Sequence, residues 1–169
     1  MKKSTLIPNI SINKIADHNK HKSVLLDYFS RQSVDKFQSI SNSDWNENKN
    51  LEREWIHYFS DHVFSQIKSN LLNDRTAIDI IIHNIWFQQY EQHDKHDWHT
   101  HTESQFTNIY YVELPDGEKT ELFDEVDIDI KEGDILSFPA YIFHRSKPNI
   151  SNQRKTVISF NSSFESLKH

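Results

Sequence analysis

Four of the eleven histidines of this chain lie within nine residues, at His93, His96, His99 and His101. Side chains at positions i and i+2 of a β-strand point to the same face, so His99 and His101 can both face one metal ion. Neutral imidazole is a ligand for iron, zinc, copper or nickel, and the carboxylate of Glu103 offers a hard oxygen nearby. The spacing alone fits a metal site and fits two solvated histidines in a polar loop equally well.

A second group of polar residues, closer to the C-terminus, favours the metal site. His144 lies near the end of one predicted strand, and Arg154 begins the next strand after a turn at residues 147–149. Arg154 and Thr156 share strand parity, so both can face the same cavity as His144. Together they would clamp a carboxylate, because a guanidinium supplies two parallel donors and the hydroxyl a third.

The elements that must position these residues have a period of two after Asp74. A long strand is predicted from Ile78 to Phe87, and turns are predicted at 115–117, 132–134 and 147–149. Further predicted strands cover 107–114, 126–130, 134–138, 141–144 and 154–164. Many short strands without intervening helices favour an antiparallel sandwich or barrel.

Helical patterns dominate the part of the chain before these strands. Residues 6–16 predict a short opening strand, and Asp17 is the predicted cap of a helix that carries Val24, Leu25, Tyr28 and Phe29 on one face. A longer helix of about five turns has an apolar residue every four positions, at Leu51, Trp55, Phe59, Val63, Ile67 and Leu71. We therefore expect one α+β domain over 1–169, with helical support in 1–74 and the β core in 75–164.

Composition excludes several classes of protein. The chain has 169 residues, no cysteine and two glycines, which excludes disulfides, cysteine–zinc sites, iron–sulfur clusters and glycine-rich phosphate loops. A net charge of −6 argues against nucleic-acid binding. No apolar run approaches the roughly 20 residues that span a bilayer, and no signal peptide is recognisable, so we expect a cytoplasmic protein without membrane contact.

The order of the motifs resembles that of the iron(II)/2-oxoglutarate-dependent oxygenases, and most of all a bacterial and phage branch with a His-x-His motif. The resemblance runs from about Trp86 to Phe164. Its landmarks are Trp86-Phe87 with Tyr90, Trp98-His99-x-His101, residues 107–115, residues 132–134, Phe138-Pro139, residues 144–146 and residues 154–161. Each landmark is weak alone, and their order and spacing make the resemblance specific.

This resemblance implies a double-stranded β-helix, or jelly roll, with helices packed on one sheet. It implies Fe(II) and 2-oxoglutarate as cofactors, with the keto acid end of 2-oxoglutarate on the metal. The far carboxylate is held in this family by an arginine about ten residues after the distal histidine, often with Ser or Thr two residues later; Arg154 and Thr156 match. Tyr110 or Tyr111, and Asn161, are candidate cofactor contacts, and parity lets only one of the two tyrosines face inward.

One departure from the family concerns the metal ligands. The usual first motif is His-x-Asp, whereas here His99 is followed by His101. The site could be an all-histidine triad of His99, His101 and His144, it could use His101 and Glu103 with His144, or it could be defective. We favour the first assignment, because the Trp-His-x-His unit looks like the signature of this branch.

The activity implied by the resemblance is hydroxylation of a small molecule or a protein side chain, with decarboxylation of 2-oxoglutarate to succinate. A phage-encoded member would act in the host cytoplasm. A rival hypothesis is a cupin-type dioxygenase with three histidines and no 2-oxoglutarate, in which Arg154 would hold a substrate carboxylate. A third is a non-catalytic jelly roll that binds a ligand, which the missing aspartate motivates.

Overall fold

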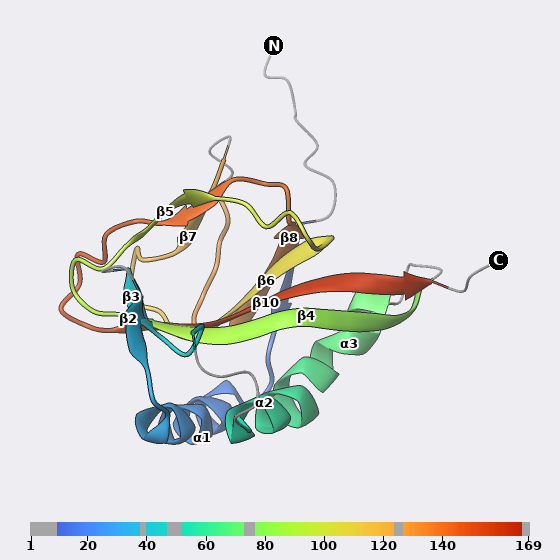
Figure 1. Cartoon of the computed structure of the whole chain (residues 1–169), viewed down its shortest axis with the longest axis horizontal. Coiled ribbons are helices and arrows are strands. Elements are labelled where there is room, and N and C mark those ends of the chain that lie inside the picture. Colours follow the sequence, from blue (N-terminus) through green and yellow to red (C-terminus); the bar gives the residue numbers. More distant parts are fainter. Residues whose placement is uncertain (1–9, 38–39, 47–51, 73–76, 124–126, 167–169) are drawn as a thin grey trace, which may run out of the picture.

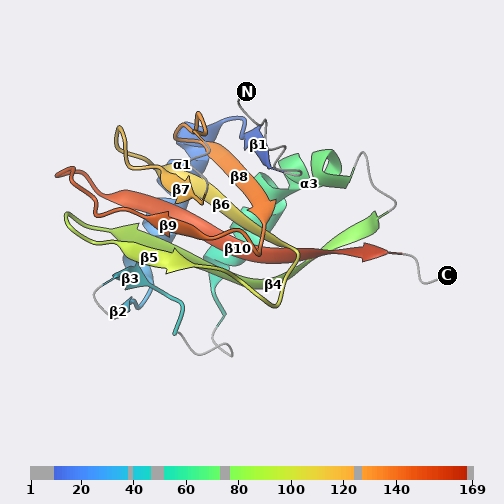
Figure 2. The same cartoon turned by 90° about the horizontal axis from the view of Figure 1, so that it is seen from above.

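In the part of the chain that the structure describes, two antiparallel β-sheets face each other, and three α-helices cover the outer face of the larger sheet (Figure 1). The computed structural model describes residues 10–37, 40–46, 52–72, 77–123 and 127–166. Seen from above, the strands of the smaller sheet lie over one half of the larger one, and the C-terminal end of β10 extends beyond them (Figure 2). The chain thus forms three layers: a small sheet, a large sheet and helices.

The larger sheet has the strand order β1-β8-β6-β10-β4-β3-β2, and the smaller sheet has the order β5-β9-β7. Strands of the larger sheet are β1 (Ser11–Lys14), β2 (Asp35–Phe37), β3 (Ser41–Ser43), β4 (Ala77–Tyr90), β6 (Phe106–Glu113), β8 (Asp134–Pro139) and β10 (Lys155–Ser166). Strands of the smaller sheet are β5 (His96–His99), β7 (Thr120–Leu122) and β9 (His144–Ser146). The helices are α1 (His18–Arg31), α2 (Glu54–Phe59) and α3 (Ser65–Leu72), and a π-helical turn (Ser60–Phe64) joins the last two.

The helix-covered face of the larger sheet holds the main apolar core. The predicted stripe is buried at Trp55, Phe59, Val63 and Ile67, while Leu51 lies outside the described residues. The predicted single helix is interrupted by the π-helical turn, which shifts the register of the stripe by part of a turn. The apolar face of α1, which was predicted after Asp17, contributes Phe29 to the same core.

Aromatic rings join this helical layer to the sheet. Phe29 stacks on Phe87 of β4 with ring centroids 4.1 Å apart, and Phe59 meets Phe160 of β10 edge-on at 5.5 Å. Such offset and edge-to-face pairs add to the free energy gained by burying the rings. The helices are therefore a fixed support for the sheet. No helix among the described residues is long and apolar enough to cross a membrane.

The start of α1 differs from the prediction. Asp17 precedes the helix, as expected, but its side chain makes no capping hydrogen bond. Its backbone is in the left-handed region, with φ of 52°, and its carbonyl oxygen accepts from the amides of Lys20 and His21. The turn is therefore closed by the main chain and not by the carboxylate.

Two predicted strands are wrong. Residues 127–130 form no strand, and the described residues before His144 form a turn, so that β9 begins where the predicted strand 141–144 ends. Four strands of three or four residues, β2, β3, β5 and β7, were not predicted. Strands of three or four residues are too short to show a period of two in the sequence. Whether such a segment forms a strand depends on its pairing with neighbouring strands.

Candidate metal and anion site

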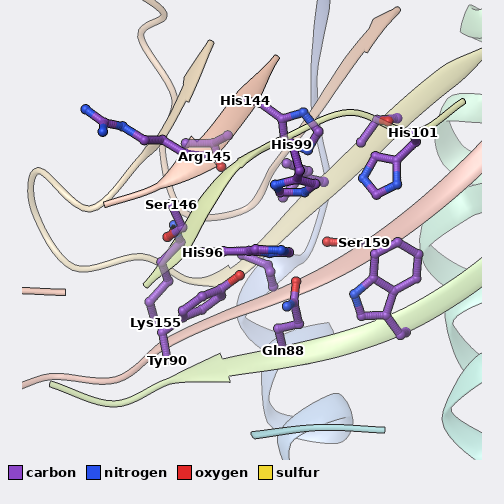
Figure 3. Close-up of a pocket in the computed structure, with 15 residues that line it drawn as sticks. Gln88, Tyr90, His96, His99, His101, His144, Arg145, Ser146, Lys155 and Ser159 are labelled. Carbon is purple, nitrogen blue, oxygen red and sulfur yellow. Dashed lines mark hydrogen bonds between the residues drawn. The ribbon is translucent and has the colours of Figure 1, made fainter. Parts of the chain in front are cut away.

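Three histidines converge between the two sheets. His99 ends β5 and pairs directly with His144, the first residue of β9, and His101 follows two residues after His99. One candidate ligand nitrogen from each ring lies within 4.8 Å of the other two. The ring centroids of His99 and His144 are 4.2 Å apart (Figure 3). The structure thus brings together the three histidines predicted to form a triad.

Main-chain carbonyls orient two of the three rings. The Nδ1 atom of His99 lies 2.7 Å from the carbonyl oxygen of Asp97, and that of His144 lies 3.1 Å from the carbonyl oxygen of Ile142. Because a carbonyl oxygen only accepts, each Nδ1 carries the proton and donates. The lone pair of each Nε2 is then available to a metal, as second-sphere contacts of metal-binding histidines normally arrange.

The rings of the triad are neutral at neutral pH. Burial, together with the charges of neighbouring histidines, lowers the pKa of His144 to about 3 and that of His101 to about 4. Burial also lowers the pKa of His99. Since neutral imidazole is the form that binds metal, the triad carries no positive charge that would oppose a cation.

The remaining candidates of the first histidine cluster lie outside the triad. His96 stacks on His99 with centroids 3.8 Å apart and faces the pocket, and burial lowers its pKa to about 4. His93 is exposed in the turn before β5, and Glu103 is exposed in the turn after His101. Glu103 is absent from the group of side chains that could share a cation among the described residues.

A buried lysine lies at the opposite end of the same pocket. The Lys155 side chain is 1% exposed and donates to Ser146 Oγ at 2.8 Å, and its Nζ lies 5.2 Å from the ring centre of Tyr90 (Figure 3). Among the described residues, no carboxylate oxygen lies within 4.0 Å of Nζ. Burial lowers the pKa of Lys155 to about 7, against the opposing charge of Glu118. A buried cation without a counter-ion is costly, and this end of the pocket suits an anion.

Polar and apolar side chains line the pocket between the triad and Lys155. The polar members include Gln88, Thr107, Thr120 and Ser159, and the apolar members are Trp86, Ile109 and Val157. Most of these side chains come from the inner face of the larger sheet, at alternate positions of β4, β6 and β10. Polar side chains therefore outnumber apolar ones in the lining, which suits a small polar or charged ligand.

The structure does not bring Arg154 and Thr156 to this pocket. Both side chains bind Glu113: the Arg154 Nε donates to Glu113 Oε2 at 2.9 Å, and the Thr156 hydroxyl donates to the same carboxylate. They share the parity of Ile158, which packs against the helices. A β-bulge opposite Thr156 and Val157 brings Glu113 to meet them. Arg154 and Thr156 therefore bind a carboxylate as predicted, but it is that of Glu113 and not that of a ligand in the pocket.

The other predicted cofactor contacts are divided between the two faces of the sheet. Tyr110 is buried on the helical side, where its hydroxyl lies 2.8 Å from His18 Nδ1. Tyr111 is buried in the apolar cluster between the sheets and does not line the pocket. Asn161 lies beside the triad, with its Nδ2 3.3 Å from His101 Nδ1. Of the three, only Asn161 touches a residue of the candidate metal site.

Sequence reasoning missed Lys155. The residue stands next to Arg154 and shares parity with Val157 and Ser159, which also line the pocket. Its signal was a lysine followed by nine uncharged strand residues, 156–164, where a charge is not expected unless it has a partner.

Solved structures of 2-oxoglutarate–iron oxygenases share this fold. The viral collagen prolyl hydroxylase of Paramecium Bursaria Chlorella virus-1, solved with 2-oxoglutarate, matches with a TM-score of 0.65 at 14% identity, over 94% of this chain and 96% of that chain. An oxidoreductase of the 2OG-Fe(II) oxygenase family from Burkholderia pseudomallei matches with a TM-score of 0.69 at 9% identity, over 91% and 84%. HygX from Streptomyces hygroscopicus, solved with nickel, 2-oxoglutarate and hygromycin B, matches with a TM-score of 0.64 at 8% identity, over 90% and 82%.

No protein-family model and no curated protein sequence matches this chain. The motifs of this chain resemble those of the iron(II)/2-oxoglutarate-dependent oxygenases, and its fold matches such enzymes over most of their length.

Proposed function

We propose that this chain is an Fe(II)- and 2-oxoglutarate-dependent dioxygenase that hydroxylates a small molecule or a protein side chain. One observation carries the proposal: a triad of neutral imidazoles and a buried lysine that forms no salt bridge among the described residues face each other across one pocket. The first end suits a divalent cation and the second suits an anion, so the pocket suits a metal with an anionic co-ligand. The shared fold supports this assignment.

The donor set fits iron. His99, His101 and His144 offer three nitrogen ligands from one side, which leaves other positions of the metal free for a co-ligand and oxygen. We propose these three as the ligands, and we leave out Glu103 because its exposed turn lies outside the group. An all-imidazole set brings no negative charge, so a divalent metal here would hold an anionic co-ligand strongly.

Lys155 and Ser146 would hold the far carboxylate of 2-oxoglutarate. The ammonium and the hydroxyl are already hydrogen-bonded at 2.8 Å, so their donors are arranged together before the anion arrives. Charge-assisted hydrogen bonds to a carboxylate are among the strongest that a pocket can offer. The keto acid end would then point to the triad, which matches the family pattern with Lys155 in place of Arg154.

The chain's own contribution to the reaction is geometric. When bound together, Fe(II) and 2-oxoglutarate supply oxygen activation: one oxygen atom enters succinate, the other enters the substrate, and carbon dioxide leaves. Lys155 fixes the orientation of the co-substrate, and the carbonyls of Asp97 and Ile142 fix two of the imidazoles. The apolar walls at Trp86 and Val157 limit water in the pocket. We propose that the two facing sheets are the double-stranded β-helix of a single oxygenase domain.

A test separates this function from its rivals. Anaerobic addition of Fe(II) and then 2-oxoglutarate to the purified chain should produce a visible metal-to-ligand charge-transfer band, and air should then release succinate when substrate is present. His144→Ala should abolish the band, whereas His57→Ala, which removes an exposed histidine of α2, should leave it unchanged. No band in the wild-type chain would overturn the proposal.

The cupin-type alternative predicts a different result in the same experiment. Such an enzyme would bind Fe(II) at the triad but would show no 2-oxoglutarate band, and Lys155 would hold a substrate carboxylate. A chain that binds neither Fe(II) nor 2-oxoglutarate would instead be a ligand-binding protein without this catalytic activity.

A further inference from the structure

The three histidines of the candidate metal site are held in different ways. Main-chain carbonyls hold His99 and His144, and substitutions cannot remove these groups. His101 lies outside the strands, and its backbone amide donates to the carbonyl oxygen of Ala140 at 3.0 Å. Its ring nitrogen Nδ1 instead meets a side chain, the amide of Asn161. His101 is thus the one member of the triad whose ring depends on another side chain for its hydrogen bond.

Asn161 is built into the sheet beneath His101. It lies on β10 opposite Thr107 of β6 and is 5% exposed. Its Oδ1 accepts from the Thr107 hydroxyl at 3.3 Å, and its Nδ2 lies 3.3 Å from His101 Nδ1. In this orientation the amide nitrogen donates, so His101 Nδ1 accepts and its proton sits on Nε2. That tautomer keeps Nε2 from binding a metal.

Turning the amide over by 180° reverses both contacts without moving the backbone. Asn161 Oδ1 then accepts from a protonated His101 Nδ1, and Nδ2 donates to the Thr107 hydroxyl, which can accept as well as donate. This state also requires a change of tautomer: His101 loses the Nε2 proton to water and takes up one proton from water at Nδ1, so the ring stays neutral. The lone pair of Nε2 then becomes available beside those of His99 and His144. The same pair of neighbours therefore satisfies Asn161 in either state.

We propose that Asn161 is a positioning residue of the metal site, whose amide turns over when a cation binds and holds His101 in the metal-binding tautomer. The inference rests on the proposed function only in requiring that the triad binds a divalent metal. It gives Asn161 a role through His101 rather than the direct contact with the cofactor that the sequence suggested. Removal of a comparable second-sphere partner typically costs about 10- to 100-fold in metal affinity.

Two variants separate the contribution of the Asn161 amide oxygen, which accepts from His101, from that of the size of the side chain. Asn161→Leu keeps the approximate size and removes both polar atoms, so Co(II) affinity should fall about 10- to 100-fold. Asn161→Asp keeps an oxygen that accepts from His101 Nδ1 and from the Thr107 hydroxyl, so affinity should equal or exceed that of the wild type. Co(II) affinity is measured by competition with a chromogenic chelator, without any substrate or turnover.

Asn108→Leu is the matched control. Asn108 is 1% exposed on the neighbouring strand β6, and its amide donates to Phe160 O and Ser162 Oγ, away from the histidines. This variant loses as many buried hydrogen bonds, so it reports the general cost of such a loss. It should melt at a lower temperature than the wild type and keep the wild-type Co(II) affinity.

A spectroscopic readout tests the tautomer directly. In the Zn(II)-loaded chain, the Nδ1 protons of all three ligands should give slowly exchanging proton resonances, and Asn161→Leu should lose or broaden the resonance of His101 alone. Equal Co(II) affinity in Asn161→Leu and the wild type would overturn the inference, as would an Asn161→Asp variant as weak as Asn161→Leu. Failure of the wild type itself to bind Co(II) would overturn the proposed metal site, a result distinct from either.

Discussion

The two faces of the seven-stranded sheet are built from the same strands and serve different purposes. The face under the helices carries Phe87, Ile158 and Phe160, which belong to one apolar cluster. The face toward the small sheet carries Gln88, Lys155 and Ser159, which line the pocket. Each of these polar residues is a neighbour in the chain of a residue of the other face.

The difference between the faces shows where the sheet gives up stability for binding. Burial of Phe87 against Phe29 and Trp55 removes apolar surface from water and makes close ring contacts. Burial of Lys155 costs free energy, because its charge leaves water without a salt bridge and the charge of Glu118 offsets only part of that cost. Stabilising residues are thus concentrated on the helical face and costly ones on the pocket face, as expected of a binding site.

The largest effect that would test this contrast comes from the neighbours Phe87 and Gln88. Phe87→Ala should lower the free energy of unfolding by about 3–5 kcal/mol, since it leaves a cavity beneath the helices. Gln88→Ala removes one hydrogen bond to Ser41 Oγ and should cost about 1 kcal/mol. Chemical denaturation of both variants measures the difference. Equal losses would show that the two faces support the fold alike.

The neighbours Arg154 and Lys155 test the same contrast in ligand binding. Lys155→Met should weaken 2-oxoglutarate binding to the Zn(II)-loaded chain by about 100-fold, or about 2.7 kcal/mol, because the bound carboxylate would be buried without its cation. Arg154→Met, whose side chain binds Glu113, should leave the affinity within about 2-fold. Calorimetric titration of each variant gives the dissociation constant. The opposite ranking would restore Arg154 as the anchor.

A smaller effect concerns pH. Burial lowers the pKa of Lys155 to about 7 in the absence of an anion, and a bound carboxylate would raise it. Binding above pH 7 therefore requires uptake of a proton, and affinity for 2-oxoglutarate should fall by up to about tenfold per pH unit as pH rises from about 7. Lys155→Arg should remove this dependence, since arginine stays charged. The test is the affinity for 2-oxoglutarate of the wild type and of Lys155→Arg, measured from pH 7 to 9.

The smallest effect is expected at the polar cluster of the helical face. Glu113→Gln should weaken the contacts to the partly exposed Arg154 and to the buried Thr156, and should cost about 1 kcal/mol or less in stability. It should not change 2-oxoglutarate affinity, because the pocket lies on the other side of β10. A loss of affinity in this variant would link the two faces of the sheet.

The local pattern indicated that His99 and His101 could share a site, and it predicted most of the apolar helical stripe. The apolar stripe repeats every four residues, so the period of a helix places it without knowledge of the rest of the chain. The spacing of His99 and His101 predicted a strand, but β5 ends at His99 and His101 lies in the segment that follows. His144 came from the order of motifs that resembles the oxygenases. The three nitrogens meet because β5 pairs with β9, which the spacing of the motifs indicated only indirectly.

The anion end of the pocket could not be predicted from the same patterns. A strand that starts at 154 can turn either Arg154 or Lys155 toward the pocket, and a shift of one residue exchanges every side chain between the faces. Strand pairing turns Lys155 toward the pocket: Lys155 pairs with Tyr90, Thr156 pairs with Glu113, and a β-bulge lies beside them. These pairings depend on partners more than 40 residues away.

The amino-acid sequence by itself determined which residues can do chemistry here: many histidines, no cysteine, and a His-x-His unit followed by a distal histidine and a basic pair. Only the tertiary structure decided which of the basic pair faces the triad, and that Asn161 contacts His101 and not the pocket. The physical reason is that side-chain identity and local period belong to the chain, whereas the face of a strand is chosen by its register against distant neighbours.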